Sequence, residues 1–116
     1  MAIITKNVDI IRGGPATIIS LSGEEIAAGE NLKLTHIASI ENMIDHEVIS
    51  VYEKTGDGTL KVYIEYFTGI NVSNFIIRSE LVSGQKQDIV GPYFRILLEE
   101  SGKTQSVIVN GVIKIS

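Results

Sequence analysis

Short apolar runs alternate along the chain with clusters of glycine, asparagine, aspartate and serine. Their spacing is typical of the strands of a sandwich or barrel, and no window keeps the 3.6-residue period of an amphipathic helix. We predict strands near residues 3–11, 16–21, 32–38, 47–53, 60–67, 73–82, 87–90, 93–99 and 105–115. Isoleucine and valine together supply 30 residues and leucine only 7, which favours pleated sheets over helices.

This strand pattern predicts an all-β protein with a single core, because 116 residues leave little room for a second one. The expected architecture is a jelly-roll-like antiparallel β-sandwich of about eight strands, and a small closed barrel is the alternative. We divide the chain into an N-terminal arm, residues 1–12, and a β-sandwich domain, residues 13–116.

The parity of the apolar positions predicts which strands form hairpins, because side chains alternate between the two faces of a sheet. Ile49 and Val51 form an odd-numbered row, whereas the row from Leu60 to Tyr66 is even-numbered. The even loop Thr55-Gly56-Asp57-Gly58 would align these rows, which predicts a hairpin between residues 47–53 and 60–67. The same reasoning predicts a second hairpin through residues 101–104.

The dipeptide Asn110-Gly111 is ordinarily a strong hairpin signal. A two-residue turn at this point would place Lys114 opposite Val107, within the apolar row. Reading straight through keeps Val107, Val109, Ile113 and Ile115 on one face. We therefore predict one long final strand, with a bulge near Gly111.

The charge and composition exclude several classes of partner. The net charge is −4 and the arginines are scattered, which argues against a nucleic-acid partner. The chain has no cysteine, and no apolar stretch approaches the roughly 20 residues that a membrane span needs. We expect no membrane span, and the N-terminal residues do not have the pattern of a classical secretion signal.

Residues that could carry catalysis are sparse and isolated. His36 and His46 stand apart, without the spacing of a zinc site, and we interpret each as a surface or hydrogen-bonded histidine. The pairs Glu24-Glu25 and Glu99-Glu100 lie beside turns, and we expect them to be solvated. No nucleophile motif or phosphate-binding loop is present. The sequence predicts a protein that is not an enzyme, with no catalytic residue, metal site or cofactor.

Surplus apolar residues on nominally outer rows favour association with other chains. The face opposite the apolar row of the first predicted hairpin carries Ser50, Tyr52, Lys61, Tyr63, Glu65 and Phe67. Its three aromatic residues are candidates for an assembly interface, unless another segment of the same chain covers this face. Ile76, Val82, Ile108 and Val112 also fall on outer rows, where a wet sheet face would be polar.

The N-terminal arm is a second candidate for contact between copies. Its apolar residues, which we assign to the assembly interface, are Ile3, Ile4, Val8, Ile10 and Ile11. A hinge of Gly13, Gly14 and Pro15 follows, with two flexible positions and a residue that ends strand pairing. The arm could pair with the sheet edge of a neighbour, or it could be an ordinary first strand and turn.

The arm, the sandwich and the closing segments YFRILL (93–98) and VIVNGVI (107–113) together resemble small jelly-roll subunits of larger assemblies. These subunits build bacterial extracellular filaments, notably endospore-appendage pilins, and virion parts such as phage decoration or tail proteins. The appendage pilins carry cysteines in their N-terminal connector and this chain has none, so cross-linking of that kind is excluded.

The resemblance implies a structural subunit of an extracellular filament or a virion, whose partners are copies of itself. The alternative hypothesis is a small β-sandwich binding module for a carbohydrate or a protein ligand.

Overall fold

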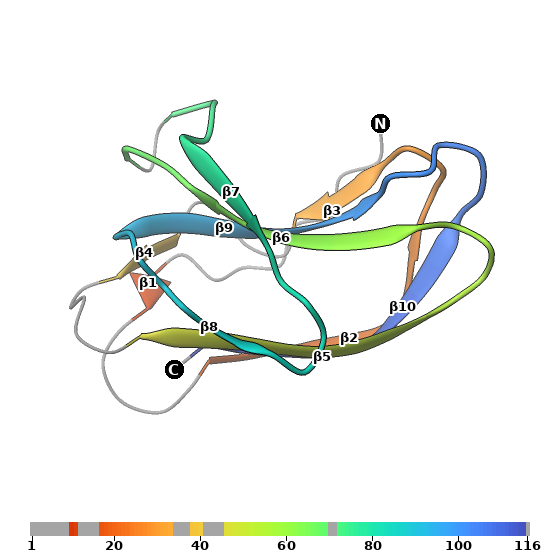
Figure 1. Ribbon diagram of the computed structural model, residues 1–116, viewed down its shortest axis with the longest axis horizontal. Coiled ribbons are helices and arrows are strands. Elements are labelled where there is room, and N and C mark those ends of the chain that lie inside the picture. The colour runs from red at the N-terminus through yellow and green to blue at the C-terminus, as the bar shows by residue number, and fades with distance from the viewer. Residues whose placement is uncertain (1–9, 12–16, 34–37, 41–45, 70–71, 116) are drawn as a thin grey trace.

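The computed structural model of the chain describes residues 10–11, 17–33, 38–40, 46–69 and 72–115, which form two packed β-sheets (Figure 1). The six-stranded sheet consists of β1 (Ile10–Ile11), β3 (Asn31–Lys33), β4 (Ala38–Ile40), β6 (Leu60–Tyr66), β7 (Ile77–Glu80) and β9 (Tyr93–Glu100). The four-stranded sheet consists of β2 (Thr17–Ile26), β5 (Glu47–Thr55), β8 (Lys86–Asp88) and β10 (Val107–Ile115).

The strands pair in a nested order, in which the first of the roll pairs with the last. β2 pairs with β10, β3 and β4 pair with successive parts of β9, β5 pairs with β8, and β6 pairs with β7, all antiparallel. A two-stranded ribbon rolled up in this way is a jelly roll, and β3 and β4 together count as one of its eight strands. The predicted fold class is therefore confirmed. β1 adds to the roll as a short parallel partner of β4.

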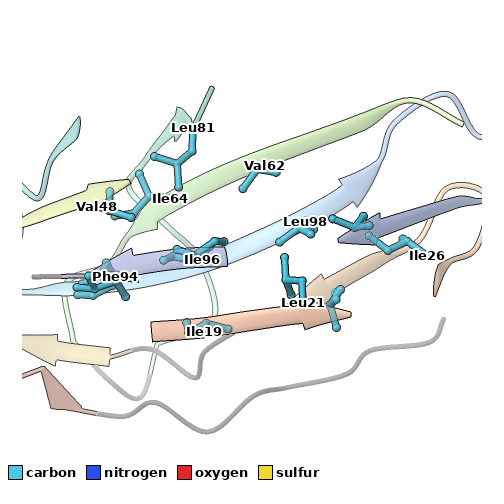
Figure 2. Packing of buried hydrophobic residues seen from close by; sticks show 14 of the residues in the cluster. Ile19, Leu21, Ile26, Val48, Val62, Ile64, Leu81, Phe94, Ile96 and Leu98 are labelled. Atoms are coloured by element: carbon cyan, nitrogen blue, oxygen red, sulfur yellow. The ribbon is translucent and has the colours of Figure 1, made fainter. Parts of the chain in front are cut away.

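One hydrophobic core fills the space between the two sheets. Figure 2 shows side chains from both sheets in this cluster, among them Ile19 and Leu21 of β2 and Ile96 and Leu98 of β9. These residues are buried because every second side chain of a sandwich strand points toward the opposite sheet. The even-numbered row predicted for residues 60–66 lies in this core, with Val62 and Ile64 fully buried.

The final strand, β10, runs without a turn from Val107 to Ile115, as predicted. Its pairing with β2 shifts register between Val109 and Gly111, where Asn110 alone lies opposite Ser22 and Gly23. The extra residue of this β-bulge therefore belongs to β2, whereas the predicted bulge was in the final strand. A Cβ atom on Gly111, whose φ is 156°, would lie 2.3 Å from the carbonyl oxygen of Val51. Glycine is therefore required at this position, where a side chain would collide with the backbone of β5.

Both predicted hairpins are wrong, because the strands they join lie in different sheets. β5 and β6 are connected by residues 56–59, yet β5 pairs with β8 and β10, whereas β6 pairs with β7 and β9. β9 and β10 are likewise divided between the sheets. A four-residue loop of turn-forming residues can cross from one sheet to the other as readily as it can close a hairpin, and parity does not separate the two arrangements.

The predicted apolar row of β5 is also wrong by one position. Val48 and Ser50 are fully buried and pair with Ile115 and Ile113 of β10, whereas Val51 points outward. The inward row contains a serine and the outward row contains Ile49 and Val51, so hydrophobicity alone selects the wrong face. Pairing with β10, whose buried row is unambiguous, determines the register.

Candidate functional site

A buried carboxylate lies on the outer face of the six-stranded sheet. Glu65 of β6 is fully buried, and each of its oxygens accepts two hydrogen bonds from one arginine. Arg78 donates to Oε2 from Nε and Nη2, at 3.2 and 2.6 Å. Arg95 donates to Oε1 from the same two atoms, at 3.1 and 2.7 Å. Such charge-assisted, paired bonds hold both guanidinium groups in fixed orientations.

Strand register brings these three charges together. β6 lies between β7 and β9, and Glu65 is directly opposite Arg78 on one side and Arg95 on the other. Residues opposite each other in neighbouring strands share a face, so all three side chains emerge on the outer side of the sheet. The arrangement depends on long-range pairing on both sides of β6.

Aromatic rings flank both arginines. The Cζ atom of Arg78 lies 4.4 Å from the ring centroid of Tyr63 and 4.7 Å from that of Phe75. The Cζ atom of Arg95 lies 4.9 Å from the ring centroid of Phe67, which is itself buried. These cation–π contacts exclude water from the sides of the guanidinium groups and strengthen their pairing with Glu65.

A cavity of about 370 Å³ opens beside this cluster, between the outer face of the sheet and the segment that precedes β7. In Figure 1 that segment projects away from the four-stranded sheet. The cavity is lined by Asn31, Glu65, Ser73, Asn74, Phe75, Arg78, Arg95, Leu97 and Glu99. We call it the outer-face pocket. Its two arginines and two glutamates cancel in formal charge, and its volume lies within the range of small-molecule sites.

Several polar groups of the outer-face pocket have unused hydrogen-bonding capacity. The Oδ1 atom of Asn31 is buried and accepts no hydrogen bond from any described residue. Each arginine uses Nε and Nη2 on Glu65, and no described residue accepts from either Nη1. Because buried polar groups are normally paired, Asn31 Oδ1 is the chemically unfinished part of the site.

The structure does not bring the predicted interface residues Tyr52, Tyr63 and Phe67 together on one exposed face. Tyr52 belongs to the other sheet and packs against the core, and its hydroxyl donates a hydrogen bond to the Leu81 carbonyl at 2.8 Å. Burial is the main cause that raises the pKa of the Tyr52 hydroxyl. Phe67 is buried within its own chain, in agreement with the alternative that another segment of the same chain covers this face.

The residues assigned to the arm lie largely outside the described residues. This holds for Ile3, Ile4 and Val8, and for the hinge residues Gly13, Gly14 and Pro15. Ile10 and Ile11 form β1 and pair with Ser39 and Ile40 of β4 within the same chain. β1 thus occupies one edge of the six-stranded sheet.

The outer face of the four-stranded sheet carries an apolar strip, which we define as Ile18, Ile49, Val51 and Val112. Val51 and Val112 are direct neighbours on β5 and β10, and Ile18 and Ile49 flank Lys114 in an adjacent row. Ile18 is 62% exposed, Val51 56% and Val112 40%. The predicted outward position of Val112 is confirmed, and Ile76 and Val82 are exposed as predicted.

A second buried carboxylate, Glu100, ties together three loops at one end of the sandwich. Its oxygens accept hydrogen bonds from the backbone N–H groups of Gly29 and Thr59, at 2.9 and 2.8 Å, and of Gly102 and Lys103, at 2.9 and 2.6 Å. These bonds, led by the one from Gly29, lower the pKa of Glu100 from 4.5 to about 2. The predicted solvated position of Glu100 is wrong, because this side chain is 1% exposed.

No protein-family model matches the chain, and no curated protein matches it.

Within the part of the chain that the structure describes, no three histidine, cysteine, aspartate or glutamate side chains are grouped so as to hold a metal ion. His46 is buried, and His36 lies outside the described residues. No helix with the length and apolar character of a membrane span occurs among the described residues.

Sequence reasoning missed the outer-face pocket. The sequence pattern alone places Glu65 on a surface face among polar residues and gives Arg78 and Arg95 no relation to it. The position of Glu65 between Tyr63 and Phe67 on one strand face is a usable signal. Its partners could be found only with β7 and β9 placed on either side of β6, because Arg78 and Arg95 are 13 and 30 residues away along the chain.

Proposed function

We propose that this chain is a non-enzymatic structural subunit that assembles with copies of itself into a filament or a virion. The observation that carries the proposal is the apolar strip on the four-stranded sheet. An antiparallel sheet with one solvated face normally shows polar residues there, whereas this face exposes isoleucine and valine side chains on three adjacent strands. In an assembly of identical subunits, a second copy of the chain is always available to cover this apolar face.

The charges around the apolar strip suit a two-fold contact between copies. Lys114 lies in the row of Ile18 and Ile49, while Glu53 lies beyond Val51 on β5. In a self-complementary contact each patch meets the same patch in reverse, so the lysine end of one copy faces the glutamate end of the other. The apolar centre is removed from water and the opposite charges form its rim.

The sheet edges offer further contacts for growth beyond a pair. Ile77 of β7 and Val90 after β8 are exposed, and they line a cavity of about 400 Å³ at the edge where both sheets end. At the opposite edge of the six-stranded sheet, β1 pairs with β4 within one chain. The same pairing made by the arm of a neighbouring copy would be a strand exchange, which needs no new kind of contact.

The variant Val112→Asp tests the apolar strip. We expect the parent chain to sediment as an oligomer or polymer and Val112→Asp as a folded monomer, because a carboxylate at the centre of the contact would be buried without a partner. Sedimentation velocity and negative-stain microscopy measure the outcome, and circular dichroism checks the fold. Gln85→Asp, in an exposed turn, is the control and should assemble normally.

A parent chain that stays monomeric at high concentration, with no particles in the microscope, would contradict the proposal. Deleting residues 2–12 tests the arm by the same measurements. If this deletion yields a folded monomer while Gln85→Asp still assembles, the arm takes part in the assembly. If the deleted chain assembles normally, the arm has no role.

A small binding module is the second candidate function. The outer-face pocket favours it, because the unpaired Oδ1 of Asn31 and several charged side chains line a cavity beside an exposed aromatic ring. The pocket and the apolar strip lie on opposite outer faces of the sandwich, so binding and assembly are compatible in one chain.

A further inference from the structure

We infer that the outer-face pocket binds a neutral sugar, a pyranoside that presents hydroxyl groups to the sheet and a C–H face to Phe75. The inference deepens the binding-module candidate and is independent of the assembly proposal. It starts from the charges of the pocket. Arg78 and Arg95 are both committed to Glu65, and the fourth charge, Glu99, brings the formal sum to zero.

A net charge of zero disfavours a free anion as the ligand. Phosphate, sulfate or a carboxylate would meet guanidinium groups that are already hydrogen-bonded to a carboxylate, because Glu65 accepts four hydrogen bonds from them. It would also be repelled by Glu65 and Glu99, because like charges close together in a partly desolvated site destabilise each other. A neutral ligand avoids both costs.

The pocket offers donors and acceptors in alternation, which suits hydroxyl groups. A hydroxyl is one donor and two acceptors, so it can bond to an arginine N–H and to a carboxylate or amide oxygen at once. The guanidinium Nη1 atoms are free donors among the described residues, and Asn31 Oδ1 and Glu99 supply acceptors. Ser73 and Asn74 add one hydroxyl and one amide from the facing segment.

Phe75 completes the match, because a pyranose ring has an apolar face of C–H groups that packs on aromatic rings. The ring of Phe75 is 40% exposed, so part of its surface is available although Arg78 contacts it. The cavity of about 370 Å³ accommodates one or two sugar rings. A ligand of about a dozen heavy atoms held mainly by hydrogen bonds is expected to bind with Kd in the millimolar range.

The experiment is a titration of the ¹⁵N-labelled chain, followed by NMR, with the methyl glycosides of glucose, galactose and mannose. N-acetylneuraminic acid and inorganic sulfate are the anionic probes. We expect at least one neutral glycoside to give saturable shifts at Asn31, Asn74 and Phe75. Asn31→Ala and Phe75→Ala are each expected to weaken binding about tenfold, whereas Val90→Ala, which truncates an exposed apolar residue that does not line the pocket, should leave Kd unchanged.

Saturable shifts that map elsewhere, or the absence of saturation by every neutral glycoside, would overturn the inference. Tighter binding of sulfate or N-acetylneuraminic acid than of all neutral glycosides would overturn the assignment of a neutral ligand. If a variant unfolds, Asn31→Ser and Phe75→Leu replace it, with the same expectation. None of these results bears on the assembly proposal, which is tested separately by sedimentation.

Discussion

The chain buries two carboxylates, Glu65 and Glu100, and satisfies them in opposite ways. Glu65 is held by two arginine side chains on the outer face of a sheet, whereas Glu100 is held by four backbone N–H groups of three loops. The Glu65 cluster can be removed as a unit by changing three side chains. The donors around Glu100 belong to the backbone and remain whatever side chain replaces it.

The difference separates a candidate binding surface from a structural contact that holds loops together. The side-chain donors around Glu65 border a pocket, and their remaining N–H groups are not used by any described residue. Backbone donors are fixed by the loops that carry them, and those around Glu100 fasten the β2–β3, β5–β6 and β9–β10 connections to one point. We therefore expect stability to depend more on Glu100, and ligand binding more on the surroundings of Glu65.

The variant Glu100→Gln should give the largest effect, lowering the Tm by on the order of 15 °C. The amide keeps one acceptor oxygen but turns an N–H₂ group toward backbone N–H donors, which leaves at least two of them unpaired. Differential scanning calorimetry measures the change. Glu99→Gln, on the half-exposed neighbour, is the matched control and should change the Tm by only a few degrees.

The variant Glu65→Gln should lower the Tm by about 10 °C, because the neutral amide leaves the two neighbouring guanidinium groups without a negative charge between them. Arg78 is a third exposed and can turn partly to solvent, which keeps the loss below that of Glu100→Gln. If Glu65→Gln lowered the Tm more than Glu100→Gln does, the expectation that stability depends more on Glu100 would be contradicted.

Acid should weaken the Glu100 tie in a defined range. Because folding lowers the pKa of Glu100 from 4.5 to about 2, its stabilising contribution is complete above pH 4.5 and is lost as the pH falls toward 2. The Tm of the parent chain is therefore expected to fall more steeply over this range than that of Glu100→Gln. An NMR titration of the Glu100 carboxyl carbon gives the pKa directly, and a midpoint near 4.5 would contradict the account.

Replacing the whole Glu65 cluster should have the smallest effect on stability. In the triple variant Glu65→Leu, Arg78→Tyr, Arg95→Met no buried charge is left unpaired, and apolar side chains of similar size occupy the space. We expect its Tm to lie within about 5 °C of the parent value. A loss as large as that of Glu65→Gln would mean that the ionic cluster itself holds β6, β7 and β9 together.

The fold class and the long final strand could be predicted from the sequence because their signals are local. Val107, Val109, Ile113 and Ile115 keep one parity across nine residues, and no alternative turn preserves it. The row from Val62 to Tyr66 is equally regular. In these strands the period of two is enough to identify the buried face.

The sheet assignment and the pocket could not be predicted, because both depend on which strands are neighbours. The turn residues 56–58 occur in hairpins and in crossings between sheets alike. In β5, Ser50 faces the core and Val51 faces outward, since β10 fixes the register against the hydrophobic pattern. The meeting of Arg78 and Arg95 on Glu65 likewise requires two long-range pairings that no local period encodes.

The nested pairing of the roll also has a consequence for the order in which the chain can fold during synthesis. β10 lies between β2 and β5 in the four-stranded sheet, so β2 has no partner in that sheet until the ribosome has released β10. The β6–β7 pair is the first of the nested pairs that can close, and it depends on no later segment. The nascent chain must therefore carry its early apolar strands uncovered through most of translation, and factors that shield nascent chains should raise its yield.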